Sequence, residues 1–244
     1  MTLNKPLIFA HRGASDVKPE NTMDAFELAL RQGADGFELD VQLSKDGEII
    51  VAHDVSLERV SDGEGYVYDY TFAELQQFDF GKVKSNAGVC KIPLLRDVYE
   101  LVNKTDIQIN VELKTTDYDY PELPQKLITL ANEYRMGERI IYSSFNHYSV
   151  MKIRSLRSMA RIGLLYTYPL YEPWRYAGDL SANAIHPHYQ NILSYPDVLH
   201  GCIENGIDVN VWTVDDVNAI KTLAQMGVTT IITNKPDVAI SAIE

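Results

Sequence analysis

Short apolar runs rich in β-branched residues alternate along this chain with segments whose apolar residues recur at helical spacing. The runs that indicate strands cover residues 6–10, 36–43, 107–114, 139–143, 162–166, 182–186, 207–213 and 229–233. The clearest helical segments cover residues 122–134, 148–158 and 215–226, and another helix begins at Asn21 or Thr22. Strands that alternate with helices form parallel sheets, and eight such units close a barrel. The predicted fold class is therefore α/β, a (β/α)8 TIM barrel.

The length of the chain fits one such barrel. The sequence has 244 residues, 45% of them apolar, and a typical barrel takes about 250. We therefore expect a single domain over residues 1–244. The interval after residue 53 breaks the alternation, with a short extra strand before it at 49–52 and helices at 72–78 and 96–102. We interpret residues of about 54–106 as a small insertion between the second and third barrel strands, at the barrel mouth.

The overall charge limits the partners. A net charge of -12 disfavours nucleic acid and anionic lipid surfaces, both of which require a basic face. A small-molecule partner is expected instead. Cys90 and Cys202 are too few for a disulfide framework. The sequence shows neither a signal peptide nor an apolar stretch of the ~20 residues that span a membrane, so a cytoplasmic location is predicted.

Three carboxylates lie in predicted strands whose remaining pattern is apolar. Glu38 and Asp40 alternate with Phe37, Leu39 and Val41, and therefore share the opposite strand face. Glu112 occupies the same kind of position in residues 107–114. Burying three carboxylates is costly unless a cation compensates them. Because all the donors are oxygens, we expect one hard divalent cation, Mg²⁺ or Ca²⁺, rather than zinc.

The other chemically capable residues also lie near strand ends. In a TIM barrel the C-terminal ends of the strands form the active face. We expect the following residues to meet there: His11, Arg12, Glu38, Asp40, His53, Glu112, Lys114 and Trp212. A purely structural alternative is a ladder of ion pairs that joins Glu112 to Arg12 and Asp40 to Lys114. The two histidines can both donate and accept protons near neutral pH, which favours catalysis.

Ordered motifs along the chain resemble those of the glycerophosphodiester phosphodiesterase family. They are His11-Arg-Gly13, Pro19-Glu-Asn-Thr22, residues 33–41, Lys45-Asp-Gly47, His53-Asp54, Val111-Glu-Leu-Lys114 and Val211-Trp-Thr213. The resemblance implies an enzyme with a TIM barrel that hydrolyses glycerophosphodiesters to glycerol 3-phosphate and an alcohol, with one bound divalent metal. Asn234 departs from the family's usual Asp, a change that we expect to bear on the leaving group.

The family pattern assigns roles to matching positions. It implies that Glu38, Asp40 and Glu112 bind the metal, that His11 and His53 are the acid/base pair, and that Arg12 and Lys114 contact the phosphate. We assign His11 as base and His53 as acid. Trp212 and Phe145 are candidates for an apolar wall beside the glycerol carbons.

Other functions remain as alternatives. A non-catalytic module that binds a phosphate ligand predicts stabilisation by ligand without turnover. A lipid phosphodiesterase on the same scaffold requires an apolar or basic membrane face. Enolase-like proton abstraction also uses acidic metal ligands in a barrel, but it requires a capping domain before the first strand, and His11 comes too early for one.

Overall fold

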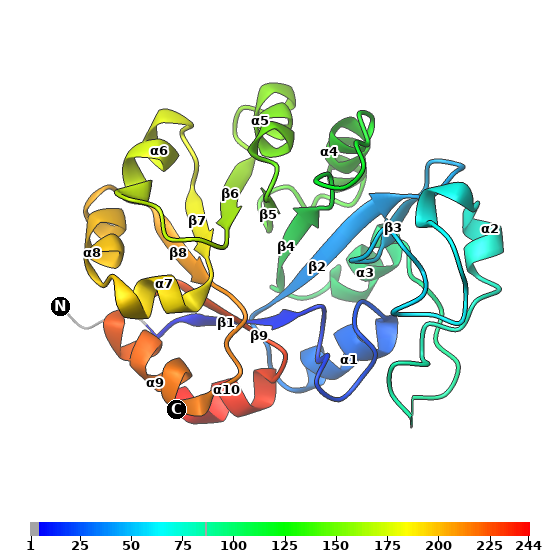
Figure 1. Ribbon diagram of the computed structural model, residues 1–244, viewed down its shortest axis with the longest axis horizontal. Coiled ribbons are helices and arrows are strands. Elements are labelled where there is room, and N and C mark those ends of the chain that lie inside the picture. Colours follow the sequence, from blue (N-terminus) through cyan, green and yellow to red (C-terminus); the bar gives the residue numbers. More distant parts are fainter. Residues whose placement is uncertain (1–4, 86) are drawn as a thin grey trace.

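The computed structural model describes residues 5–85 and 87–244, and its central feature is a barrel of parallel strands surrounded by helices (Figure 1). The barrel strands are β1 (Leu7–His11), β2 (Gly36–Leu43), β4 (Gln108–Leu113), β5 (Ile140–Ser144), β6 (Arg161–Tyr166), β7 (Ala184–Pro187), β8 (Asp208–Val211) and β9 (Thr230–Thr233). Each strand pairs with the next, and β9 pairs with β1 to close the ring. The predicted TIM barrel is confirmed. Residues 1–4, considered above for a signal sequence, lie outside the described residues.

Helices form the outer layer. The predicted helices are α1 (Met23–Arg31), α4 (Leu123–Glu133), α5 (His147–Leu156) and α9 (Val217–Met226). Four more helices also lie in this layer: α6 (Pro173–Asp179), α7 (Tyr189–Ser194), α8 (Asp197–Glu204) and α10 (Pro236–Ile243). Each of these four spans little more than two turns or less, too short for a clear apolar repeat. No helix in the described residues combines the length and apolar character needed to cross a lipid bilayer.

The insertion lies between β2 and β4. It contains β3 (Ile49–Val51), which pairs antiparallel with β2, the 3₁₀ helix η1 (Val67–Asp69), α2 (Phe72–Leu75) and α3 (Leu95–Val102). Leu57, Val67 and Leu75 belong to a separate small core, whereas Val98 and Tyr99 of α3 pack into the barrel core. The segment with its own core is therefore shorter than the predicted 54–106, because α3 is a barrel helix.

Strand register places the polar residues of β1, β2 and β4 side by side. His11 pairs with Glu38 across β1 and β2, and Asp40 pairs with Glu112 across β2 and β4. Phe37 and Leu39 are fully buried in the core formed with the surrounding helices. Since neighbouring side chains on a strand point to opposite faces, Glu38 and Asp40 point into the barrel.

Candidate active site

Three buried carboxylates meet inside the barrel toward the C-terminal ends of β2 and β4. Glu38, Asp40 and Glu112 each place an oxygen within 4.8 Å of the others, and none of these residues is more than 8% exposed. The direct pairing of Asp40 with Glu112 across the two strands brings two of them together. The acidic cluster expected from the sequence is therefore formed by the fold.

Two cations lie beside this cluster. Nε of Arg12 lies 3.2 Å from Oδ2 of Asp40. Nζ of Lys114 lies 2.7 Å from Oε1 of Glu112 and 3.8 Å from Oδ1 of Asp40. The alternative ladder is thus only partly formed, because Lys114 does approach Asp40 but Arg12 contacts Asp40 and Glu20 instead of Glu112.

The three carboxyl groups differ in how well they are compensated. Burial disfavours the charge of Asp40, but Arg12 and Lys114 outweigh burial and hold its pKa below the usual value. Burial, followed by repulsion from Asp40 and Glu112, raises the pKa of Glu38 well above the usual value. Burial also raises the pKa of Glu112 despite the nearby Lys114. Glu38 is therefore the least compensated member of the cluster.

The donor set fits a hard divalent cation. Its donors are all carboxylate oxygens, and Oδ1 of Asp40 has no hydrogen-bond partner among the residues that the structure describes. Three carboxylates beside two cations leave an excess of negative charge that a divalent ion would neutralise. Zinc sites, in contrast, are usually built from nitrogen and sulfur donors. The cluster is a candidate divalent metal site.

The ring of His11, at the end of β1, is fixed by Asn234. Nδ1 of His11 lies 2.7 Å from Oδ1 of Asn234. The amide nitrogen of Asn234 donates to Asp215 at 2.6 Å, so the amide oxygen is the end that faces His11. Nδ1 therefore carries the ring proton, and Nε2 presents a lone pair 3.9 Å from Glu38. Burial lowers the pKa of His11 to about 4, so the ring is neutral at pH 7.

His53 follows β3 and is held by a chain of charged residues. Its Nδ1 bonds the carboxylate of Asp54, which leaves Nε2 for the pocket that the residue lines. Arg59 bonds both oxygens of Asp54 and both oxygens of Glu20. Glu20 also accepts a hydrogen bond from Arg12 at 2.8 Å. Burial opposes the charge of Asp54, but hydrogen bonds from Arg59 and His53 lower its pKa to about 2.

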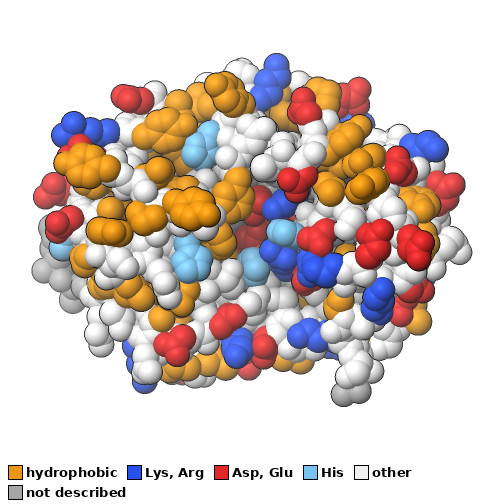
Figure 2. Space-filling view, viewed as in Figure 1, with side chains coloured by type: hydrophobic (Ala, Val, Ile, Leu, Met, Phe, Trp, Pro, Cys, Tyr) orange, Lys and Arg blue, Asp and Glu red, His pale blue; other side chains and the backbone are white. Residues whose placement is uncertain are grey.

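A pocket of about 90 Å³ opens among these side chains, and Figure 2 shows acidic and histidine side chains at the centre of this face. The pocket is lined by His11, Arg12, Glu38, His53, Asn110, Glu112, Phe145, Leu165, Trp212, Thr213 and Ile232. Asp40 and Lys114 contact lining residues but do not line the pocket. Seven of the nine predicted site residues therefore line one pocket, and their roles stay predictions.

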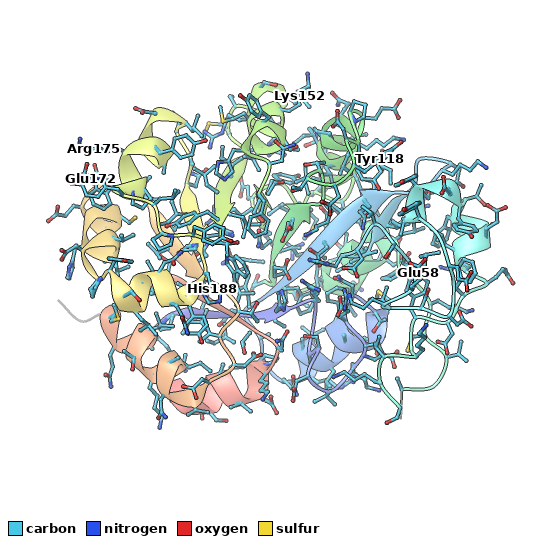
Figure 3. All side chains as sticks on the ribbon, in the orientation of Figure 1. Glu58, Tyr118, Lys152, Glu172, Arg175 and His188 are labelled. Atoms are coloured by element: carbon cyan, nitrogen blue, oxygen red, sulfur yellow. The ribbon has the colours of Figure 1, made fainter. Side chains whose placement is uncertain are left out.

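Phe145 and Trp212 form the apolar side of the pocket. Their rings meet edge to face with centroids 5.5 Å apart. The indole N–H of Trp212 donates to the backbone oxygen of His186 at 2.8 Å. The ring of His188, labelled in Figure 3, packs edge-on against Trp212 at 5.6 Å. Because its polar atom is bonded and its ring is packed, Trp212 forms a rigid wall.

Sequence reasoning missed residues that hold the site in place. Asn21 was considered as a helix cap, but Thr22 caps α1, and Asn21 donates to Asp40 at 2.9 Å. The left-handed backbone of Asn21, with φ of 57°, directs it away from the helix. Asn234 contacts His11, a contact that the sequence did not indicate, and its effect on the leaving group stays a prediction. Arg59 lay outside the quoted motifs, so nothing singled it out.

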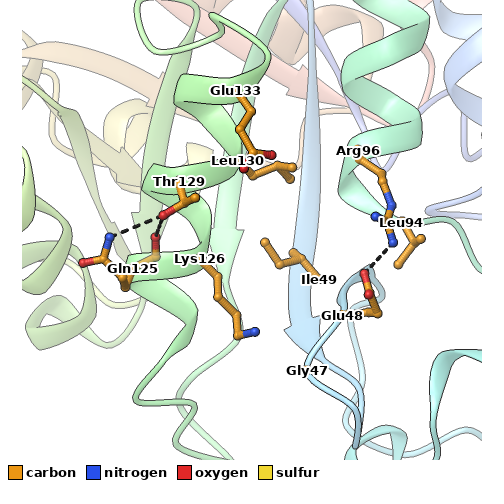
Figure 4. Close-up of a pocket in the computed structure, with 10 residues that line it drawn as sticks. All are labelled: Gly47, Glu48, Ile49, Leu94, Arg96, Gln125, Lys126, Thr129, Leu130 and Glu133. Atoms are coloured by element: carbon orange, nitrogen blue, oxygen red, sulfur yellow. Dashed lines mark hydrogen bonds and ion pairs between the residues drawn. The ribbon is translucent and has the colours of Figure 1, made fainter.

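Another cavity, of about 260 Å³, lies outside the barrel wall among β3, α3 and α4 (Figure 4). Arg96, Lys126 and Glu133 are among the residues that line it, and no predicted site residue does. Arg96 is paired with Glu48 at 2.6 Å. This cavity is separate from the residues that gather at the barrel mouth.

A family model, related sequences and solved structures all match most of this chain. Residues 11–238 match the Glycerophosphoryl diester phosphodiesterase family. A glycerophosphodiester phosphodiesterase of Caldanaerobacter subterraneus subsp. tengcongensis is 42% identical over 240 residues, 98% of each chain. One from Bacillus altitudinis is 36% identical over 235 residues, 96% of each chain. A solved Oleispira antarctica phosphodiesterase, in complex with the product sn-glycerol-3-phosphate, has a TM-score of 0.83 at 27% identity and covers 98% of this chain and 97% of its own.

The fold and the side chains at its mouth define a TIM-barrel protein with a candidate site for metal-assisted chemistry. Within that class, this chain belongs to the glycerophosphoryl diester phosphodiesterase family. The family resemblance predicted from the motifs is confirmed, and the protein is an enzyme of the phosphodiesterase type.

Proposed function

We propose that the protein hydrolyses glycerophosphodiesters such as glycerophosphocholine or glycerophosphoethanolamine to sn-glycerol 3-phosphate and an alcohol. The observation that carries this proposal is the meeting of a buried acidic cluster with His11 and His53 at one end of the barrel. The substrate class in the names of the relatives and the product in the Oleispira complex support it.

Positive charge is the first requirement of this reaction, because the substrate is an anion. Glu38, Asp40 and Glu112 would hold one Mg²⁺ or Ca²⁺, which supplies positive charge beside a phosphate oxygen when bound. Arg12 lines the pocket, where it would contact the phosphate. Lys114, bonded to Glu112 at 2.7 Å, adds a second cation behind the same pocket. Together they offset locally the net charge of -12.

Proton transfer is the second requirement. Nε2 of His11 carries the lone pair and takes the proton of the attacking hydroxyl, either from water or from the glycerol itself. As the new phosphorus–oxygen bond forms, the bond to the leaving alcohol breaks, and His53 gives that alcohol its proton. When the glycerol hydroxyl attacks, this step gives a cyclic phosphate. Water then opens the ring to glycerol 3-phosphate, with His53 taking the proton of the water and His11 returning its proton to the glycerol oxygen. Phe145 and Trp212 offer an apolar wall to the glycerol carbons.

The test measures glycerol 3-phosphate release from a panel of glycerophosphodiesters. We expect EDTA to abolish release, and Mg²⁺ or Ca²⁺ to restore it. The His11→Ala and His53→Ala variants should each lose roughly 10²- to 10⁴-fold in kcat while remaining folded. His200→Ala, which changes an exposed histidine of α8, is the matched control.

Two results would contradict the proposal. Near-normal kcat in either active-site variant would remove that histidine from its role. If no diester is hydrolysed with any metal, yet the substrates still raise the unfolding temperature, the protein is a binding module.

A further inference from the structure

A larger hollow continues from the catalytic pocket toward the loop between β6 and α6. It measures about 610 Å³ and shares Phe145 and Leu165 with the pocket. Its other lining residues are His147, Tyr166, Thr167, Tyr168, Leu170, Tyr171, Pro173 and Tyr176; we call this hollow the aromatic groove. The catalytic pocket, at about 90 Å³, is far smaller than the ~300–1,000 Å³ of most small-molecule sites. A diester bound there must extend into an adjoining space, and the aromatic groove adjoins the pocket at Phe145 and Leu165.

Large hydrophobic side chains stand exposed along the aromatic groove. Tyr171 is 92% exposed, Tyr168 82%, Tyr176 43% and Leu170 39%. Figure 2 shows hydrophobic side chains gathered on the same half of this face as α6 in Figure 1. Single exposed hydrophobic residues are ordinary, but a cluster beside a pocket marks a contact surface.

The groove offers ring faces but no free charge. Among its lining residues there is no Asp, Glu, Lys or Arg. Its histidine, His147, uses both ring nitrogens, with Nδ1 3.0 Å from the Tyr176 hydroxyl and Nε2 3.0 Å from the Leu165 oxygen. The nearby Glu172 and Arg175 pair with each other at 3.0 Å at the outer edge of α6 (Figure 3). A primary ammonium would therefore find no carboxylate in the groove, and a carboxylate would find no cation.

We infer that the aromatic groove binds the alcohol part of the substrate and selects alcohols whose far end has no hydrogen-bond donor. Such ends are a quaternary ammonium, as in choline, or an alkyl group. Ring faces attract a quaternary ammonium and also cover alkyl carbons. A primary ammonium would find only tyrosine and threonine hydroxyls there and no carboxylate, so it would exchange its hydration for weaker hydrogen bonds. This inference rests on the proposed function, since it assigns the leaving-group side of the same reaction.

The test compares kcat/KM for four substrates in the wild type and in a Tyr168→Ala/Tyr171→Ala variant. The substrates are glycerophosphocholine, its neutral tert-butyl analogue, glycerophosphoethanolamine and the glycerophosphate methyl ester. We expect the variant to lose roughly 3- to 30-fold on the choline substrate and a smaller factor on its neutral analogue. The methyl ester, which lacks the choline end, should be hydrolysed as before. Tyr148→Ala, a tyrosine 90% exposed on α5 but outside the groove, is the matched control.

A second measurement does not depend on turnover. Saturation transfer from protein protons to the methyl groups of glycerophosphocholine should be strong in the wild type and weak in the Tyr168→Ala/Tyr171→Ala variant. In Tyr148→Ala it should be as strong as in the wild type. An equal loss of activity on all four substrates, or unchanged activity and saturation transfer with the choline substrate, would overturn the inference. If the wild type hydrolyses none of the substrates, the proposed function fails, but the saturation-transfer comparison still decides whether the groove binds choline.

Discussion

Arg59 shows how a residue outside the pocket can hold its chemistry in place. Its guanidinium bonds two carboxylates, Asp54 and Glu20, through both oxygens of each. Asp54 orients His53, and Glu20 accepts a hydrogen bond from Arg12. His53 and Arg12, the groups proposed for proton transfer and for phosphate contact, are thus joined through Arg59.

Replacing Arg59 should therefore reduce turnover. In Arg59→Ala, Asp54 and Glu20 lose their shared cation, and His53 loses its orientation, so kcat should fall roughly 10- to 100-fold. Arg59→Lys should recover only part of this loss, because an ammonium cannot bond two carboxylates in the same planar geometry. Steady-state kinetics on one diester provide the measurement, with Arg31→Ala, in an exposed ion pair on α1, as the control. Full activity in Arg59→Ala would show that the network has no part in catalysis.

Single residues differ in how well the sequence predicted them. Glu38 and Asp40 were identifiable because alternation along one strand places them on a face where carboxylates are costly. Asn234 and Arg59 were not, because their roles come from contacts across the fold. Asn234 lies 223 positions from His11 in sequence. No local pattern reports such a pairing.

At the scale of elements, the strands were predicted more completely than the helices. A barrel strand buried on both faces shows as a continuous apolar run, which local sequence reveals. The short helices α6 and α7 have seven and six residues and no comparable repeat. The apolar pattern also did not predict the register between strands, which brings Asp40 beside Glu112.

Close packing between β6 and β7 gives an element-level prediction. A Cβ on Gly163 would lie 2.3 Å from Nε2 of His186, a fully buried ring bonded to Asn210 at 2.9 Å. Gly163→Ala should displace this ring and lower the free energy of unfolding by about 1–3 kcal/mol. In Gly178→Ala, at an exposed position of α6, the added carbon meets nothing within 4 Å, so stability should stay equal or rise. Urea unfolding measures both, and equal stability of Gly163→Ala and wild type would contradict this account of the packing.

At the scale of the whole molecule, an acidic protein must bind an anionic substrate. The net charge is -12, yet Arg12 and Lys114 lie at the barrel centre beside three carboxylates. The barrel and the position of its mouth followed from the sequence, because the strand–helix alternation persists through most of the chain. The aromatic groove did not, because it depends on how the exposed loop between β6 and α6 folds back beside Phe145.

The balance of charge at the barrel centre predicts that, without metal, Glu38→Gln raises the stability of the fold and Asp40→Asn lowers it. The pKa of Glu38 is higher in the folded protein than in the unfolded chain. The group therefore destabilises the fold at a pH above the ordinary pKa of a glutamate, and this destabilisation is lost as the pH falls to that value. Glu38→Gln should therefore be more stable than wild type in EDTA at pH 8, and this advantage should shrink toward pH 5. Asp40 has a lowered pKa and compensates Arg12 and Lys114. Asp40→Asn should lose roughly 1–3 kcal/mol, because Arg12 and Lys114 lose the carboxylate they share and keep only Glu20 and Glu112.

Added metal should reverse the order of Glu38→Gln and wild type. An ion that binds only the folded protein stabilises it by about 2.7 kcal/mol at one hundred times its dissociation constant. The wild type should gain this stability with Mg²⁺ or Ca²⁺, and Glu38→Gln should gain little because one ligand has lost its charge. Calorimetry with EDTA or with added metal provides the measurement, and the exposed Glu133→Gln controls for net charge. If Glu38→Gln is less stable in EDTA and metal raises its unfolding temperature as much as that of wild type, the cluster is a structural ion-pair ladder rather than a metal site.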